Sequence, residues 1–306
     1  MPGWVAKPLR WVRLNLMKIL SYVFTAVDFC VPKRKDLIVI GSGFGRSWWD
    51  GNARALLNFV REHVPDMTAC YWRPVPPDVP DEHCLVGKGW RVTWTMLRAG
   101  AVVSTHGIND FGQYRFSRRT LYVHLGHGLA LKAVGYTDRP LGRRRPFSKW
   151  AWARRAGSYV ASRGSCPPGR YLGGRNTVAG RADLFVSPSR EAKSRKCAAY
   201  RIDPRRVFLC GQPRNDELVR GEIRTPLRDL LPEGLDFKKV ILYAPTFRHD
   251  TETRAFPSSD TEAESLNAFL VKHHTLLLTR RHPADTTYWP AAASDHIIDF
   301  GFDVCP

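Results

Sequence analysis

The chain has 306 residues, of which 43% are hydrophobic and 11% aromatic, and its 47 Lys and Arg against 28 Asp and Glu give a net charge of +19. This length suffices for two domains with separate cores, and the aromatic content excludes a disordered low-complexity chain. The seven cysteines are scattered and form no CxxC pair. That argues against a zinc ribbon or a disulfide framework and predicts reduced thiols in a cytosolic protein.

The positive charge lies in two regions, residues 1–35 with a net charge of +6 and residues 139–206 with +15, and the remainder is close to neutral. In the first region, apolar and aromatic side chains are interleaved with Lys and Arg, but the longest uncharged run, 19–27, is shorter than the roughly 20 residues that cross a bilayer. No cleavage site of a signal peptide follows it. We expect residues 1–35 to attach peripherally to an anionic membrane at its cytoplasmic face; the alternative is a helix docked on the core of the next domain.

The next region begins with a buried-strand pattern at 36–40, a glycine-rich turn and a helical stretch at 52–63. Arg46 stands where a GxGxxG fingerprint needs its third glycine, so we interpret the turn as a strand-to-helix connection. Further strand patterns occur at 68–71, 101–104, 120–124, 184–186 and 207–210, with a helix at 92–98. This alternation predicts a parallel sheet covered by helices.

Residues 138–180 interrupt the alternation with Pro, Gly and many Arg, and we interpret them as a basic excursion with a helix near 149–155. After 226–236 a second unit follows, with a strand at 240–244, a helix at 263–273 and a strand at 275–279. We therefore predict an α/β protein with two Rossmann-like domains, 36–225 and 226–306, that face each other across a cleft.

One candidate catalytic group follows the strand at 120–124, where His127 stands between Gly126 and Gly128, with Lys132 five residues beyond. Glycines let backbone N–H groups approach an anion, and imidazole is suited to act as a general base. His124 lies three residues earlier and would face the other side of the sheet if the strand continued. A loop histidine without a catalytic role is the alternative.

Three further segments follow strand patterns, at the edge where open α/β sheets bind ligands. In the first, Asn215 and Asp216 can cap the next helix, whereas Arg214 can reach a phosphate. The other two carry Thr246 with Arg248, and Arg281 with His282; taken singly, each reads as a solvated basic loop. A cationic edge with histidines suits phosphate chemistry without a metal or other cofactor, and no HExxH or DxD signature is present.

Taken together, these segments resemble the motifs of the CDP-glycerol glycerophosphotransferase family, the teichoic-acid primases and polymerases. The matching landmarks are His127-Gly128 with Lys132, where Gly126 replaces the family's Trp, Gly211–Asp216, Tyr243–Arg248, Arg281–Pro283 and a weaker match at Asp50–Arg54. The resemblance implies a GT-B architecture and a reaction in which a hydroxyl of a lipid-linked polyol-phosphate acceptor attacks the β-phosphate of CDP-glycerol and releases CMP.

By this resemblance, His127 is the base for the acceptor hydroxyl, and His282 binds the donor pyrophosphate. Gly128, Lys132, Asn215, Asp216 and Thr246 are expected to line the substrate sites, with Arg214, Arg248 and Arg281 as phosphate contacts suggested by charge. Holding two anionic reactants together and neutralising charge on the transferred group is the main catalytic task in phosphoryl transfer.

The chain departs from the family where a TDYSS-like segment is expected, because none occurs and the sequence ends at Pro306. We therefore expect a truncated C-terminal domain with an open sheet edge and weak or absent activity. A catalytically impaired relative that binds only the acceptor at the membrane is one alternative.

Two further alternatives stay open. Within the same enzyme class, the donor could be CDP-ribitol or a nucleotide sugar. A nucleic-acid-binding protein is suggested by the basic region and its interleaved aromatic residues, but no RRM, KH, zinc-finger or helix-turn-helix signature supports it, so no nucleic acid partner is expected.

Overall fold

The computed structural model describes residues 23–43, 51–75, 81–112, 114–129, 182–200, 202–221, 227–245, 256–280 and 295–299. The chain divides into two compact units, Met1–Glu222 and Ile223–Pro306, which we describe separately.

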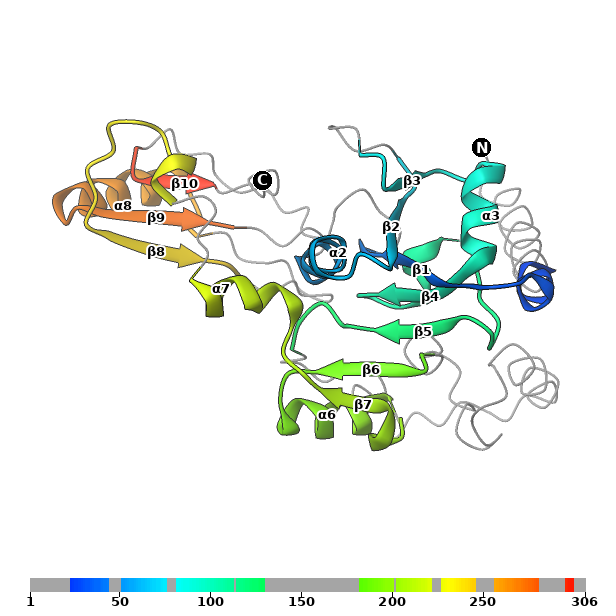
Figure 1. Ribbon diagram of the computed structural model, residues 1–306. Helices are drawn as coiled ribbons and strands as arrows, with labels where there is room; N and C mark the ends of the chain where they lie inside the picture. The colour runs from blue at the N-terminus through cyan, green and yellow to red at the C-terminus, as the bar shows by residue number, and fades with distance from the viewer. Residues whose placement is uncertain are drawn as a thin grey trace, which may run out of the picture. The chain divides into compact units, whose positions relative to one another are not determined.

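A seven-stranded sheet forms the first unit, and every neighbouring pair of its strands is parallel. The strand order is β3-β2-β1-β4-β5-β6-β7, so the direction of winding reverses between β1 and β4. In Figure 1 the arrowheads of β4 to β7 point the same way. The strands are β1 (Arg34–Gly41), β2 (Thr68–Arg73), β3 (Cys84–Val86), β4 (Ala99–Ser104), β5 (Leu121–His124), β6 (Leu184–Ser187) and β7 (Val207–Leu209).

Both faces of this sheet are covered, which explains why its strands are apolar at successive positions rather than at alternate ones. Along β1, Val39 belongs to one buried cluster and Ile40 to another, because successive side chains point to opposite faces. Helix α2 (Gly51–His63) packs Ala53, Leu57 and Val60 on the Ile40 face. These residues are spaced as one stripe of a helix requires.

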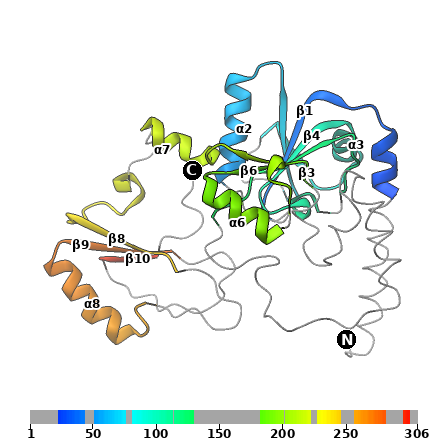
Figure 2. The ribbon, with the colours of Figure 1, turned by 90° about the horizontal axis from the view of Figure 1, so that it is seen from below.

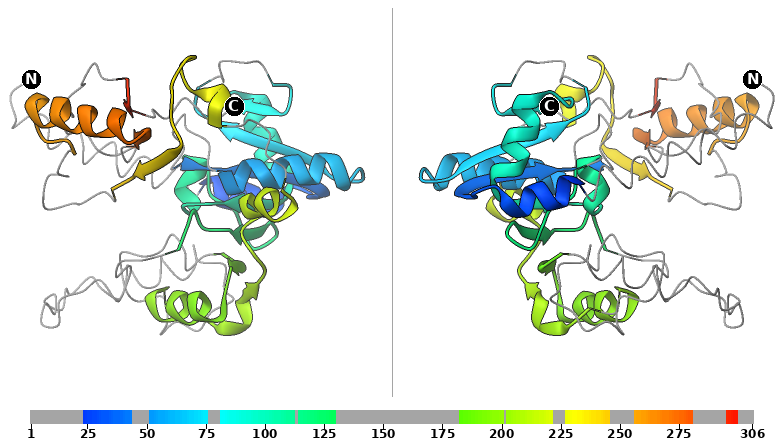
Figure 3. Two further views of the ribbon diagram at one scale, coloured as in Figure 1. Left: turned by 90° about the vertical axis from the view of Figure 1, so that its left-hand side faces the viewer. Right: turned by 90° about the vertical axis from the view of Figure 1, so that its right-hand side faces the viewer.

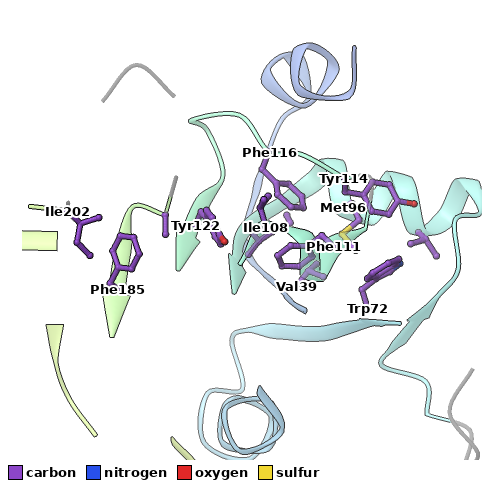
Figure 4. Close-up of a cluster of buried hydrophobic side chains, with 14 of the residues drawn as sticks. Val39, Trp72, Met96, Ile108, Phe111, Tyr114, Phe116, Tyr122, Phe185 and Ile202 are labelled. Carbon is purple, nitrogen blue, oxygen red and sulfur yellow. The ribbon is translucent and has the colours of Figure 1, made fainter. Parts of the chain in front are cut away.

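Helix α3 (Trp90–Arg98) covers the opposite face with Val92 and Met96 (Figure 2). Figure 4 shows this second cluster, in which the rings of Trp72, Phe111 and Tyr114 gather close to Met96. The predicted strands and the α2 and α3 helices are thus confirmed, with ends shifted by up to two residues.

Helix α6 (Arg190–Tyr200) lies at the β6–β7 end of the sheet (Figure 3) and was not predicted. Five of its eleven residues are charged, and Ala199 is its one fully buried residue, so it carries no apolar stripe. Instead, Lys193 donates a hydrogen bond to the carbonyl of Val207 and Lys196 donates one to Val186. Two ammonium groups therefore bond this helix to the strands, and Cys197 and Tyr200 near its C-terminal end pack against the buried cluster that contains Val39 and Met96.

Residues 23–30 form a helix that docks on the rest of the first unit. This agrees with the alternative given for the N-terminal region, a helix docked on the core of the next domain. Phe24 meets the edge of Tyr114 at 5.1 Å between ring centroids. The fully buried carboxylate of Asp28 accepts hydrogen bonds from Lys33 Nζ at 2.7 Å and from the Ser117 N–H at 2.7 Å. Residues 1–22 lie outside the described part of the chain.

Within the described residues, no helix combines the length and apolar character that a bilayer crossing requires. The predicted helix near 149–155 and the rest of the excursion at 138–180 fall outside those residues.

The second unit contains a parallel sheet of order β10-β9-β8, made of β8 (Lys239–Tyr243), β9 (Thr275–Thr279) and β10 (Ile297–Asp299). Helix α8 (Asp260–Lys272) connects β8 to β9, and its N-cap Ser259 accepts a hydrogen bond from the Glu262 N–H. All of β9 is buried, whereas the side chains of Val240, Ile241 and Leu242 on β8 are exposed. The predicted strand at 275–279 is confirmed residue for residue.

Candidate active site

The carboxyl ends of the central strands bring together polar residues from distant parts of the first unit. Ser42 follows β1, Thr105 and His106 follow β4, and His127 follows β5. The Ser42 and Thr105 hydroxyls lie 3.2 Å apart, which joins the two loops at the point where the strand order reverses. Open α/β sheets bind ligands at such a point.

His127 occupies a tight turn just beyond β5, so the strand does not continue to it. The turn begins with the Leu125 N–H donating to the carbonyl of Ser104, and Gly126 takes a φ of 79°, which favours glycine. The imidazole of His127 is exposed, and its Nδ1 lies 3.4 Å from the Thr105 carbonyl oxygen. Because a carbonyl only accepts, we assign the proton to Nδ1, which leaves Nε2 with a lone pair that can take a proton.

The His106 ring stacks on His127 with 4.0 Å between ring centroids and 5° between ring planes. Its side chain is 5% exposed, and burial, together with the neighbouring His127 and His124, lowers the pKa of His106 to about 3. His106 is therefore neutral at physiological pH. His106 was not among the predicted site residues, although His106-Gly107, at the end of the preceding strand, repeats the His-Gly pair of the next loop.

Asn52, in the first turn of α2, connects two of the predicted motifs. Its side chain is fully buried; Nδ2 donates to the Gly126 carbonyl at 2.8 Å, and Oδ1 accepts from the Arg214 N–H at 3.4 Å. The side-chain amide of Asn52 thus links its own helix to the segments at Gly126 and Arg214. Asn52 falls in the weakest of the sequence matches, and its role was not predicted.

The motif at 211–216 forms a 3₁₀ turn, η5 (Pro213–Asn215), followed by the short helix α7 (Asp216–Arg220). Arg214 is exposed, and its Nη2 lies 3.8 Å from the position that a Cβ on Gly128 would take. The guanidinium therefore reaches the turn at residues 125–128, which carries His127 and is called the histidine turn below. Asn215 occupies the N-cap position of α7, but its side chain makes no capping hydrogen bond, which corrects the capping interpretation. Asp216 stands in the first turn of α7, where a negative charge is favourable.

Lys196 approaches the same turn from the other side. Its Nζ lies 3.5 Å from the position of a Cβ on Gly126, and burial lowers the pKa of its ammonium to about 8. Beside it, His124 is buried at the end of β5, with Nδ1 3.2 Å from the Ser104 hydroxyl. Burial first, then the charges of Lys196 and His127, lower the pKa of His124 to about 3, against the opposing effect of Ser104. The histidine turn therefore lies between the cationic groups of Lys196 and Arg214, and the buried His124 at the end of β5 is neutral.

In the second unit, β8 and β9 are parallel neighbours, and the Arg280 N–H donates to the Tyr243 carbonyl at 2.9 Å. The motifs that follow these strands therefore leave the same edge of that sheet. Their predicted site residues, Thr246, Arg248, Arg281 and His282, lie outside the described residues, as does Lys132 of the first unit. Among the residues that the structure describes, no cluster of three or more His, Cys, Asp or Glu has the arrangement of a metal site.

Comparison with solved structures shows the fold. The wall teichoic acid polymerase TagF matches with a TM-score of 0.60 and 20% identity over 92% of this chain and 66% of that one. A second TagF structure, its H548A variant, matches with a TM-score of 0.63 and 20% identity over 98% and 70%. The α/β fold is of the GT-B type, as predicted.

Two curated relatives align over 89 residues each. The teichoic acid poly(glycerol phosphate) polymerase of Staphylococcus epidermidis is 38% identical over 26% of this chain, and the teichoic acid ribitol-phosphate polymerase TarK of Staphylococcus aureus is 33% identical over 28%. The aligned parts are 12% and 17% of those proteins' own lengths, so the match covers less than a fifth of either relative.

A family model extends the match to nearly the whole chain. The model for CDP-glycerol:poly(glycerophosphate) glycerophosphotransferases matches residues 23–302, a range that contains the histidine turn, the Arg214 segment and both strand ends of the second unit. The chain therefore belongs to the CDP-glycerol:poly(glycerophosphate) glycerophosphotransferase family.

Proposed function

We propose that this protein transfers glycerol phosphate from CDP-glycerol to a hydroxyl of a lipid-linked polyol-phosphate acceptor and releases CMP. The observation that carries the proposal is the arrangement of His127, whose Nδ1 faces the Thr105 carbonyl and whose Nε2 is left as the proton acceptor. Family membership supports the reaction type, and the position of His127 supports its assignment as the base.

In the proposed reaction, the acceptor hydroxyl gives its proton to His127 Nε2 as its oxygen forms a bond to the β-phosphorus of CDP-glycerol. The bond from that phosphorus to the bridging oxygen breaks, and CMP leaves with the electron pair. Arg214 neutralises phosphate charge beside the turn, and Gly128 lets an anion approach the backbone.

The residues of the second unit complete the proposal on the donor side. We assign His282 to the donor pyrophosphate, with Thr246, Arg248 and Arg281 as further donor contacts and Lys132 as a further substrate contact. Their support is the family motif that each belongs to and the common strand edge from which the donor-side motifs leave.

Substitution of His127 tests the function. We would incubate the protein with labelled CDP-glycerol and a short lipid-linked acceptor, and measure CMP release and label transfer. H127A should lower turnover at least about 100-fold, as expected for loss of a general base, whereas H63A removes an exposed histidine of α2 and should leave turnover unchanged. Equal turnover by H127A and wild type would refute the assignment, and no CMP release from any donor would refute the reaction.

The donor polyol has a second candidate, because one curated relative is named as a ribitol-phosphate polymerase. CDP-ribitol differs from CDP-glycerol only in the polyol, so the same base and phosphate contacts would serve both. Parallel assays with the two donors at equal concentration separate the candidates. A higher kcat/KM with CDP-ribitol would replace glycerol by ribitol in the proposal.

We also propose peripheral attachment to the anionic cytoplasmic face of a membrane. In the helix at 23–30, the face that does not dock exposes Val23, Val27 and Phe29, and the guanidinium of Arg118 lies 5.5 Å from the Phe29 ring. Apolar groups beside cations suit an anionic lipid interface. The protein should co-sediment with phosphatidylglycerol vesicles and not with phosphatidylcholine vesicles; equal sedimentation with both would contradict this.

A further inference from the structure

His106 has no assigned role, yet it is held more firmly than the histidine that it touches. The loop after β4 is fixed by Asp110, whose Oδ2 accepts hydrogen bonds from the Thr105 N–H at 2.9 Å and the His106 N–H at 2.8 Å. Asp110 is fully buried and lies in the 3₁₀ turn η2 (Ile108–Phe111). Two charge-assisted bonds from one carboxylate set the position of the His106 backbone.

The ring of His106 is fixed as well. Its Nδ1 lies 2.8 Å from the Thr105 hydroxyl oxygen, which in turn lies 3.2 Å from the Ser42 hydroxyl of the β1 loop. The Asp110 Oδ1 is 4.0 Å from the same Nδ1. With its side chain 5% exposed, the ring has little room to rotate and forms a flat surface at a fixed place.

His127, by contrast, is exposed and sits on a turn between two glycines. Two contacts orient its ring: the near-parallel stacking on His106 and the approach of Nδ1 to the Thr105 carbonyl. Thr105 thus serves both rings, with its hydroxyl on His106 and its carbonyl on His127. Without the stacked ring, the 3.4 Å contact alone would have to select one rotamer and one tautomer, which a single weak hydrogen bond does poorly.

We propose that His106 is a positioning residue for the transfer reaction, a rigid platform that holds the His127 ring so that Nδ1 stays on the Thr105 carbonyl and Nε2 stays available to the acceptor hydroxyl. This rests on the proposed function only in its catalytic consequence, because the orientation of His127 can be measured without turnover. His106 touches no reacting atom, and its effect acts through His127.

The charge state of the pair follows from the same geometry. Two imidazolium rings 4.0 Å apart repel each other, and burial opposes protonation of His106, so the proton taken from the acceptor stays on His127. A neutral aromatic face against that imidazolium then stabilises the charge that develops during the reaction. A platform of another flat, neutral ring should preserve this effect.

Three substitutions at one position separate the platform from simple packing. H106F keeps a flat neutral ring, H106L fills the space without a flat face, and H106A leaves it open. We expect H106A and H106L to lower kcat about 10–100-fold, as misorientation of a base does, with the KM for CDP-glycerol changed less than about twofold. H106F should recover kcat to within about fivefold of wild type, because the stacked face is kept.

The second measurement is the tautomer of His127, read from the ring nitrogen shifts in ¹⁵N NMR spectra, with H127Q used to assign the signals. The wild type and H106F should hold the Nδ1–H form, and H106L and H106A should shift toward the Nε2–H form that a solvent-exposed histidine side chain favours in water. Urea unfolding midpoints identify a variant that does not fold, and the comparison of H106F with H106L still stands if H106A fails.

Wild-type kcat in H106L together with an unchanged His127 tautomer would overturn the proposal. So would equal losses in H106F and H106L, since they would mean that the flat face has no role. If the wild type shows no turnover, the proposed function fails, whereas an altered His127 tautomer in H106L still supports the platform.

Discussion

The two buried neutral histidines at the site should make the protein sensitive to mild acid. Burial is the main cause that lowers the pKa of both His124 and His106 to about 3, from an ordinary value of 6.5. Between pH 3 and 6.5 the unfolded chain therefore binds protons that the folded chain does not. The free energy of unfolding is fully retained above pH 6.5 and falls as the pH drops through that window.

The magnitude follows from the width of the window. pH 5 lies about 1.5 units below the ordinary histidine pKa of 6.5, and each unit favours the protonated, unfolded chain by about 1.36 kcal/mol. The free energy of unfolding therefore falls by about 2 kcal/mol for each buried ring. Against a typical total of about 5–15 kcal/mol, this is a substantial loss. The tertiary structure at the carboxyl ends of β4 and β5 should therefore weaken markedly between pH 7 and pH 5.

Urea unfolding at pH 7 and pH 5, followed by tryptophan fluorescence, measures this loss. H124F keeps an aromatic ring against Phe185, which the histidine now meets edge-on, and removes one titrating group. It should reduce the difference between the two pH values by about 2 kcal/mol. H63F, on the exposed part of α2, is the matched control and should leave the wild-type difference in place. A pH difference in H124F as large as in wild type would refute the reasoning, as would a gain of stability on acidification.

Three further substitutions test contacts that hold the first unit together. Asn52→Asp removes the amide that donates to Gly126 and sets a carboxylate against a carbonyl, so it should cost about 1–3 kcal/mol and lower turnover; urea midpoints and CMP release measure both effects. Asp28→Asn removes the counter-charge of a nearly buried lysine and should cost about 3–5 kcal/mol, with a loss under 1 kcal/mol contradicting the buried pair. Gly100→Ala would place a Cβ against a backbone carbonyl of β1, and we expect more than about 4 kcal/mol of destabilisation, read as loss of soluble folded protein.

The strand and helix pattern was predictable because parallel strands buried on both faces are short continuous apolar runs. The Leu37–Ile40 run and the Leu276–Leu278 run both became strands in parallel sheets. Helix α6 was not predicted because five of its eleven residues are charged and its few core contacts lie at its C-terminal end, so the sequence shows no periodic apolar signal. Strand β3 was not predicted either.

The site was predictable only in part, for a related reason. His127 and Arg214 stand beside glycines at strand ends, which a sequence displays directly. Asn52 and His106 owe their roles to contacts across 74 residues and between two loops, and no local pattern marks such a partner. Their polar side chains are buried, and a buried polar group reveals its purpose only when its partner is known.

These findings divide the site into residues that hold it and residues that present chemistry, and the division can be measured. Asn52 and Asp110 are buried and bond to backbone groups of the loops, whereas His127 and Arg214 are exposed. Exposed substitutions away from packing usually change stability by less than about 0.5 kcal/mol. H127A and R214A should therefore lower turnover while keeping the urea midpoint, and N52D should lower both.

Arg214 is the sharper case, because its backbone N–H bonds Asn52 while its guanidinium reaches the histidine turn. R214A keeps the backbone bond and removes the cation alone, so any loss of turnover reports phosphate contact rather than loop position. R214K restores a positive charge without the planar pair of donors and should recover part of the activity. A drop in the urea midpoint of R214A as large as that of N52D would show that the side chain holds the fold, and would remove Arg214 from the residues that bind phosphate.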